Sequence, residues 1–380
     1  MKYLCLILAL ILLLCGCAAS QAAPDLPEMV PVETETEAPT TQATQPPDPV
    51  PGLLEAMTTE EKVGQLFLAR CPDENALEDI EAYHLGGYIL FWKDFDGQTP
   101  DTLKETLSGY QNAAAIPLLI AVDEEGGTVN RVSLNHSLRH RPFSSPRKLY
   151  SQGGMDYVIA AEEEKAQLLS SLGINVNMAP VCDITTDRSA FMYDRSLGES
   201  PEETGQFVKR TVQTMSENHV GSVLKHFPGY GNNADTHTGI AVDERTLEEL
   251  EERDLVPFTV GIVNGCDAIL MSHTIVTAFD SEYPVSLSPA AHEYLRQMQG
   301  FEGVIVTDDL VMQAITDTYG AEEAAVLAVL AGNDLLCSTE YRVQYQAVLE
   351  AVNSGRIPME LLDKAAERIL RWKMELGLIF

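Results

Sequence analysis

Eight short apolar runs, separated by longer segments of helical periodicity, limit the fold of this 380-residue chain more than any other feature. Each run is almost continuously apolar, which is typical of parallel strands buried on both faces of a sheet. The runs predict strands at residues 64–69, 87–91, 117–122, 174–179, 222–224, 268–271, 303–306 and 334–336. Helices are predicted at residues 74–84, 101–115, 155–172, 202–218, 246–264, 289–299, 319–331, 341–354 and 358–376.

This alternation predicts an α/β fold, a single (β/α)8 TIM-type barrel over residues 52–380. A doubly wound open sheet is the alternative, but no G-x-G-x-x-G sequence follows the first expected strand. The chain has 57 acidic and 25 basic residues and a formal net charge of −32. Because contact with phosphates needs a basic face, no nucleic-acid partner is expected.

The N-terminal segment indicates export. Residues 4–14 form an apolar run of signal-peptide length, too short to span a membrane comfortably. The run ends in Leu-Cys-Gly-Cys at 14–17, which resembles the lipobox of bacterial lipoproteins. That resemblance implies a signal peptide at 1–17, with Cys17 lipidated as the mature N-terminus, and a protein held outside the bacterial cell membrane by a lipid anchor only. A plain secretory signal and an uncleaved anchor are the alternatives.

A proline-rich linker is expected after Cys17. Residues 18–51 contain no Lys or Arg and show no periodic apolar pattern, so they are predicted to be disordered and extended. The four cysteines beyond the leader, at 71, 182, 266 and 337, are widely spaced. Several lie within apolar runs, which indicates small buried residues rather than a disulfide framework.

Polar residues gather where the expected strands end, and in a barrel these ends build the active site. Any one of them could be a cap or a solvated residue, and Thr307-Asp308-Asp309 alone would also suit a helix N-cap. Five strand ends together favour a site. The residues concerned are Asp123, Glu124, Glu125 and Arg131, then Asp183, Asp194 and Arg195, then Lys225, His226, Asp235 and His237, then Ser272 and His273, and then Asp308 and Asp309.

These residue types suit a carbohydrate ligand, because sugar hydroxyls need both donors and acceptors. Asp308 directly follows a buried strand and is the candidate nucleophile for glycoside hydrolysis. Asp235 and His237 are two residues apart, so in an extended loop they can face the same way. The carboxylate would then orient the imidazole and favour its protonated form, which suits a general acid/base.

Four motifs carry a family resemblance: Lys-His-Phe-Pro-Gly at 225–229 with the following Asp-x-His, Asp-Glu-Glu-Gly-Gly at 123–127 with its Arg, Asp-Arg-Ser-Leu-Gly at 194–198, and Thr-Asp-Asp-Leu-x-Met at 307–312. Together they resemble glycoside hydrolase family 3, in its NagZ-like β-N-acetylglucosaminidase branch, over about residues 53–376. The resemblance implies a retaining double displacement on cell-wall fragments, with no metal and no cofactor. It implies Asp308 as nucleophile, His237 as acid/base and Asp235 as its orienting partner. It also implies that the non-reducing N-acetylglucosamine is held by Asp123, Arg131, Arg195, Lys225 and His226.

The chain departs from the family pattern at Tyr230, Asn232 and Glu124, which leaves the leaving-group preference open. An imidazole acid/base would not repel phosphate, so phosphorolysis is a minor hypothesis. Three other readings compete. One is a metal-dependent hydrolase built from His226, Asp235, His237 and Asp308. Another is a non-catalytic sugar-binding lipoprotein, and the last is a β-glucosidase or β-xylosidase of the same family.

Overall fold

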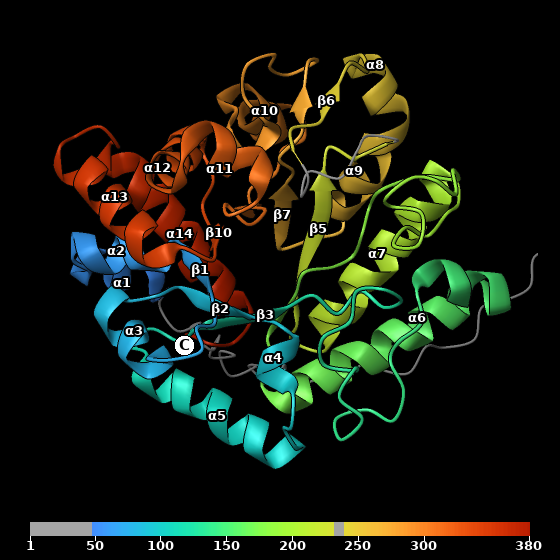
Figure 1. Ribbon diagram of the computed structural model, residues 1–380, viewed down its shortest axis with the longest axis horizontal. Helices are drawn as coiled ribbons and strands as arrows, with labels where there is room; N and C mark the ends of the chain where they lie inside the picture. Colours follow the sequence, from blue (N-terminus) through green and yellow to red (C-terminus); the bar gives the residue numbers. More distant parts are fainter. Residues whose placement is uncertain (1–47, 232–238) are drawn as a thin grey trace, which may run out of the picture. The chain divides into compact units, whose positions relative to one another are not determined.

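The computed structural model describes residues 48–231 and 239–380, and the part from Asp48 to Phe380 is one compact unit. Eight parallel strands form its centre, in the order β10-β1-β2-β3-β4-β5-β7-β9 (Figure 1). They are β1 (Phe67–Arg70), β2 (Gly87–Leu90), β3 (Leu119–Val122), β4 (Val176–Asn177), β5 (Gly221–Phe227), β7 (Ala268–Met271), β9 (Val304–Thr307) and β10 (Leu336–Ser338).

The two edge strands of this sheet meet. Val306 and Leu335 form a parallel bridge, and the Thr307 amide donates to the Leu335 carbonyl over 3.1 Å. The sheet therefore closes on itself, which confirms the predicted (β/α)8 barrel. Closure leaves no unpaired strand edge in this sheet. Every residue of β2, β3, β5, β7 and β9 is buried, which is the burial expected of parallel strands with near-continuous apolar sequences.

Helices surround the strands (Figure 1). Three of the long ones begin with a proline preceded by a capping Ser or Thr: Thr99 for α5, Ser145 for α6 and Ser200 for α7. The longer helices are α3 (Ala76–Tyr83), α5 (Pro100–Ala113), α6 (Pro146–Leu172), α7 (Pro201–Glu217), α9 (Leu255–Val263), α12 (Ala321–Ala331), α13 (Tyr341–Asn353) and α14 (Met359–Glu375). Shorter ones are α1 (Val50–Ala56), α4 (Trp92–Phe95), α8 (Leu247–Glu249), α10 (Pro289–Glu293) and α11 (Gln313–Tyr319).

The first strand begins later than the sequence pattern predicts. Residues 59–65 form helix α2 (Thr59–Gln65), and β1 starts only at Phe67. Thr58 and Glu61 cap this helix reciprocally, because each side chain accepts a hydrogen bond from the other residue's amide. The expected strand over 64–69 is therefore wrong at its start, and the Thr-x-x-Glu spacing was the signal that marks the helix.

Helix α14 closes the amino end of the barrel. Its Trp372 side chain lines a small space inside the barrel together with Leu119, Val223 and Val306. A Cβ at Gly221, the first residue of β5, would lie 2.8 Å from the Trp372 ring, so the strand and the indole approach each other closely only because this residue is glycine. The opposite, carboxyl end of the barrel is left for the site.

Loops over that carboxyl end carry a second, two-stranded parallel sheet of β6 (Val242–Asp243) and β8 (Ile275–Val276). Arg245 follows β6 and donates to Gly229 O over 2.7 Å, while its guanidinium forms ion pairs with Asp243 and Asp254. The end of β6 is thereby fixed to the start of the loop after β5. In the described part of the chain, no helix is long and apolar enough to cross a membrane.

Candidate active site

A cavity of about 650 Å³ opens at the carboxyl ends of the strands. Nine of the strand-end residues named from the sequence line it: Asp123, Glu125, Arg131, Asp194, Arg195, Lys225, His226, Asp308 and Asp309. They come from β3, β4, β5 and β9 or from the loops that follow these strands. The prediction that residues at the strand ends meet at one site is thus confirmed for these residues, which lie far apart in the chain. Asp235, His237, Asn232 and Cys17 lie outside the described residues.

Lys225 is the centre of a buried charge network. Its Nζ lies 2.6 Å from Asp123 Oδ1 and 2.6 Å from Glu125 Oε1. Arg195 binds the same Glu125 carboxylate through two nitrogens, at 2.8 and 3.0 Å. Burial alone would raise the pKa of Glu125, but the charges of Lys225 and Arg195 outweigh it and hold that pKa well below its usual value. The network therefore keeps the Glu125 carboxylate and the two cations, Lys225 and Arg195, ionised in the cavity.

His226 is held on both ring nitrogens. Its Nδ1 lies 2.8 Å from Asp183 Oδ2, and its Nε2 lies 3.1 Å from an Arg195 nitrogen. Because a guanidinium only donates, Nε2 accepts, and Nδ1 carries the proton that is donated to Asp183. Asp183 also accepts from the His226 and Tyr230 amides, at 3.1 and 2.7 Å, so this buried carboxylate fixes both the ring and the start of the following loop.

Glu124 lies under the cavity with its side chain fully buried. Its Oε2 accepts from the amides of Arg131 and Val132, at 2.7 and 2.8 Å. Its Oε1 accepts from the amide and the hydroxyl of Ser133. One carboxylate thus satisfies four donors of the turn that carries Arg131, which makes Glu124 a positioning residue rather than a group that contacts the ligand.

A buried ion pair on α6 supports the neighbouring backbone. Lys165 Nζ lies 2.7 Å from Glu162 Oε1 and donates to the Glu125 carbonyl over 3.0 Å. Asn177 on β4 bonds both the amide and the carbonyl of Glu124, at 3.0 and 3.1 Å. The segment that carries Asp123 and Glu125 is therefore fixed from two sides.

Asp308 and Asp309 follow β9 and have different surroundings. Asp308 Oδ1 accepts the Asp309 amide over 2.9 Å, and its own amide donates to Met271 O over 3.2 Å. The Asp309 carboxylate accepts from the Thr339 hydroxyl and amide, and burial raises its pKa. The next helix, α11, begins only at Gln313, so this pair does not act as its N-cap.

Several residues of the cavity lining were not named from the sequence, and two of them, Arg70 and Phe91, lie at strand ends. Arg70 is the last residue of β1 and Phe91 directly follows β2, so the rule of strand ends could have found both. The expected strands ended at 69 and 91, which left Arg70 outside and made Phe91 part of a strand. His273, which the sequence did bring forward, is buried instead, with its ring nitrogens 2.7 Å from Ser286 Oγ and 3.1 Å from Asp309 O.

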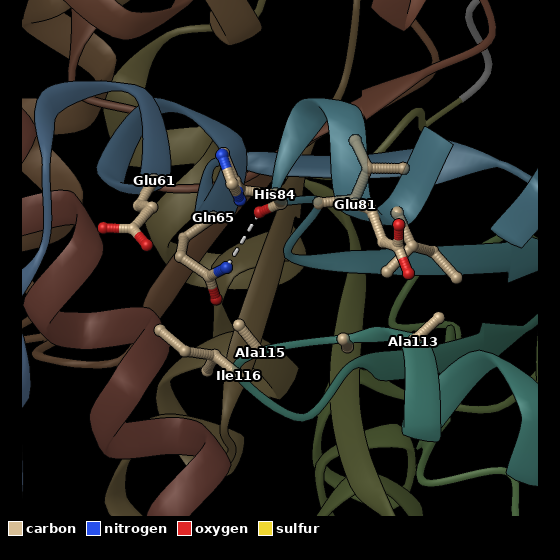
Figure 2. Close-up of a pocket in the computed structure, with 10 residues that line it drawn as sticks. Glu61, Gln65, Glu81, His84, Ala113, Ala115 and Ile116 are labelled. Atoms are coloured by element: carbon tan, nitrogen blue, oxygen red, sulfur yellow. Dashed lines mark hydrogen bonds between the residues drawn. The ribbon is translucent and has the colours of Figure 1, made fainter. Parts of the chain in front are cut away.

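A smaller cavity of about 200 Å³ is lined by residues of α2 and α3 and by the segments that lead into β2 and β3 (Figure 2). Ala113, Ala115 and Ile116 form part of its wall, and the Gln65 side chain donates to His84 O over 2.9 Å. Asp308, the one residue predicted for catalysis that lies within the described ranges, is not part of its lining. Within the described ranges, no three His, Cys, Asp or Glu side chains are grouped to hold a metal ion.

A closed (β/α)8 barrel with carboxylates, guanidinium groups and an ammonium group in one polar cavity is the architecture of a barrel enzyme for polyhydroxylated ligands. More specifically, the chain belongs to glycosyl hydrolase family 3: the profile of that family's N-terminal domain matches residues 58–372.

Relatives of similar length support this membership. The β-hexosaminidase LpqI of Mycobacterium tuberculosis is 30% identical over 367 residues, covering 93% of this chain and 90% of the relative. A β-hexosaminidase of Idiomarina loihiensis is 32% identical, covering 82% of this chain and 93% of its own length. The solved family 3 β-N-acetylglucosaminidase of Paenibacillus sp. FPU-7 superposes with a TM-score of 0.79 at 32% identity. That alignment covers 85% of this chain and 63% of the Paenibacillus chain.

Proposed function

We propose that this glycosyl hydrolase family 3 enzyme removes non-reducing terminal β-N-acetylglucosamine with retention of configuration. Its curated relatives of matching length are β-hexosaminidases, which supports the class of glycosidic bond. The observation that carries the proposal is the network of Asp123, Glu125, Arg195 and Lys225 beside Asp308 in one cavity. A cavity of about 650 Å³ suits a ligand of one or two sugar rings.

In the proposed first step, the Asp308 carboxylate attacks the anomeric carbon and the bond to the leaving oxygen breaks. The protonated His237 imidazole, oriented by Asp235, donates its proton to that oxygen, so the aglycone leaves as an alcohol. In the second step, His237 takes a proton from water, the water oxygen attacks the anomeric carbon, and the Asp308 carboxylate is released. The sugar leaves with its original configuration.

Asp123, Arg131, Arg195, Lys225 and His226 are proposed to hold the sugar. Lys225 and Arg195 are pinned by Glu125, so their remaining donors are preorganised for hydroxyl oxygens. The His226 Nε2 already accepts from Arg195 and its Nδ1 donates to Asp183, so neither nitrogen is open for a metal ion. This argues against the metal-dependent hydrolase, and full activity in EDTA would exclude it.

The natural substrate is proposed to be peptidoglycan fragments, reached outside the cell by a lipoprotein anchored through Cys17. The lipobox-like sequence at 14–17 and the linker composition support this placement.

The decisive test uses residues 48–380 on p-nitrophenyl β-N-acetylglucosaminide and on the β-glucoside. We expect cleavage of the N-acetyl substrate only, loss of at least 1,000-fold in kcat for Asp308→Asn, and a smaller loss for His237→Ala. Asp309→Asn is the matched control, because the carboxylate of Asp309 is bonded to Thr339. Preference for the glucoside would instead indicate a β-glucosidase, and no cleavage by a folded protein would favour a sugar-binding role. Formation of a glycosyl phosphate when phosphate is added would indicate phosphorolysis.

A further inference from the structure

The turn after β9 carries Asp308, the proposed nucleophile, and the backbone of Asp309 holds this turn together. The Asp309 amide donates to Asp308 Oδ1 over 2.9 Å, so it orients the carboxylate that would attack the sugar. The Asp309 carbonyl accepts the Met312 amide over 3.0 Å, and Asp309 Oδ1 accepts the Val311 amide over 3.1 Å. Residues 308–312 therefore form one compact turn, in which the direction of the Asp308 carboxylate depends on the Asp309 backbone.

His273 contacts this turn from the neighbouring strand. It lies two residues after the end of β7, which pairs with β9, and its Nε2 lies 3.1 Å from the Asp309 carbonyl oxygen. Because a carbonyl oxygen only accepts, Nε2 carries the proton and donates it. On the other side of the turn, the Asp309 carboxylate accepts from Thr339, which follows β10. The turn after β9 is thus held from both of the strands beside it.

The His273 ring is itself fixed by buried polar groups. Its Nδ1 lies 2.7 Å from Ser286 Oγ, and in the neutral ring with its proton on Nε2 this nitrogen accepts from the hydroxyl. Ser286 belongs to the 3-10 helix η3 (Val285–Leu287). Its amide donates to Ser272 O over 3.0 Å, and its carbonyl accepts from the Asn333 side chain over 2.7 Å. Ser286 is therefore rigidly placed, and it directs His273 Nε2 at the turn.

His273 is not part of the cavity wall. Its side chain is fully buried, whereas Asp308, Asp309 and Met312 all line the cavity. The hydrogen bond from His273 ends on the Asp309 carbonyl, one residue beyond the nucleophile. His273 would therefore act on the reaction through the turn and not through contact with the sugar.

We propose that His273 is a positioning residue for the nucleophile, which keeps the Asp308 carboxylate directed at the anomeric carbon by binding the Asp309 carbonyl. The inference rests on the proposed function and adds to it a residue outside the cavity. A reacting group displaced by about 1 Å can cost about 100-fold in rate, so the loss of this hydrogen bond should slow the attack. Sugar binding should be kept, because Lys225 and Arg195 come from other strand ends.

The test measures two quantities on the full-length protein. One is the first-turnover rate of p-nitrophenol release from p-nitrophenyl β-N-acetylglucosaminide, which reports attack by the nucleophile. The other is the Kd of N-acetylglucosamine, which binds without reacting. We expect His273→Ala to lower the rate by about 30-fold and to leave Kd within twofold of the wild type.

Two amide substitutions separate the hydrogen bond from the ring. Glutamine places its side-chain nitrogen close to the position of the histidine Nε2, so His273→Gln should restore most of the lost rate. Asparagine is shorter and places its nitrogen close to the position of Nδ1, out of reach of Asp309, so His273→Asn should be as slow as His273→Ala. If His273→Ala fails to fold, the contrast between glutamine and asparagine still decides the question.

His292→Gln is the matched control for a general loss of packing. His292 is also buried, but its Nδ1 lies 2.8 Å from Ser288 O instead of contacting the turn. This variant should lose melting temperature about as His273→Ala does and keep its first-turnover rate within twofold. The loss in His273→Ala should also be equal for phenyl and p-nitrophenyl glycosides. A misplaced acid/base would instead slow the phenyl glycoside more, because its leaving oxygen has the greater need of a proton.

A first-turnover rate of His273→Ala within threefold of the wild type would overturn the positioning role and leave the glycosidase proposal intact. Equal losses in the glutamine and asparagine variants, or an equal loss in His292→Gln, would also overturn it, because the bond to Asp309 would then not be the cause. If the wild type released p-nitrophenol from neither the N-acetylglucosaminide nor the glucoside, the proposed function would fail, and the role of His273 with it.

Discussion

Glu124 is the residue whose side chain does most to shape the site without reaching the ligand. Its carboxylate collects four donors from Arg131, Val132 and Ser133. A glutamine has one acceptor oxygen, and its NH2 group would face N–H donors. We expect Glu124→Gln to lower the free energy of unfolding by about 1–3 kcal/mol, measured by urea denaturation.

The same change should raise KM more than it lowers kcat, because the turn that carries Arg131 loses its anchor. Ser133→Ala removes a single donor from the same cluster and should cost only about 1 kcal/mol, with little change in KM. If Glu124→Gln were as stable as the wild type with an unchanged KM, the positioning role of Glu124 would be refuted.

Individual site residues could be predicted because a barrel places its chemistry at strand ends, a rule that needs only the order of the chain. The hydrogen-bond and ion-pair partners of these residues could not be predicted in the same way. Lys225 and Asp123 are 102 residues apart, and the sequence does not reveal which carboxylate the lysine contacts. The stacking of Arg70 on Phe91 likewise depends on the register of β1 against β2, in which Arg70 pairs with Ile89.

At the scale of elements, the apolar runs gave seven of the eight strands close to their places, because strands buried on both faces have no polar positions to obscure them. The first strand was misplaced because apolar residues also occur in the capped helix α2. The two-residue strands β6 and β8 escaped prediction, since so short a segment has no measurable periodicity.

Helix α14 closes the amino end of the barrel, so its Trp372 should contribute strongly to stability. We expect Trp372→Ala to lower the free energy of unfolding by about 3–5 kcal/mol, because the space below β5 would be left unfilled. Trp92, on α4, is 40% exposed and is the matched control, with an expected effect below about 1 kcal/mol. Equal losses from both substitutions in chemical denaturation would show that α14 does not close the barrel.

Lys373, the next residue of α14, is fully buried and donates to Gln65 Oε1 over 2.6 Å. Burial lowers its pKa from 10.5 to about 7. Between pH 7 and about 10.5, Lys373 is neutral in the folded state but still protonated in the unfolded state, so the folded state binds fewer protons. The contribution of Lys373 to the free energy of unfolding therefore increases with pH over this range. Below pH 7 its charge opposes folding, by up to about 5 kcal/mol.

Lys373→Met removes that charge. We expect the variant to have a higher melting temperature than the wild type at pH 6. This difference should disappear by pH 10, because the wild-type amine is then neutral in the folded state and keeps its hydrogen bond to Gln65. Lys364→Met, at an exposed position of the same helix paired with Glu360, should show no such trend. A difference between Lys373→Met and the wild type that is constant with pH would contradict the lowered pKa.

At the scale of the whole molecule, the lining residues that the structure describes, from Arg70 to Cys337, all belong to the unit from Asp48 to Phe380. We therefore expect a chain that starts at Asp48 to keep kcat/KM on a soluble chromogenic substrate within twofold of the full-length protein. A larger loss in a folded, truncated enzyme would show that the N-terminal segment contributes to catalysis.

The N-terminal segment should instead decide location. Expressed in a bacterial host, the full-length protein is expected in the membrane fraction, and Cys17→Ser should move it to the soluble extracytoplasmic fraction because lipidation needs the thiol. Cys15→Ser, two residues earlier in the same apolar context, should remain in the membrane fraction and is the matched control.

If Cys17→Ser stayed with the membrane, an uncleaved anchor would explain the leader better. If the wild type were soluble outside the cytoplasm, the leader would be a plain secretory signal. Either outcome would leave the barrel and its proposed chemistry unchanged, because every described lining residue of the cavity belongs to the barrel unit from Asp48 to Phe380.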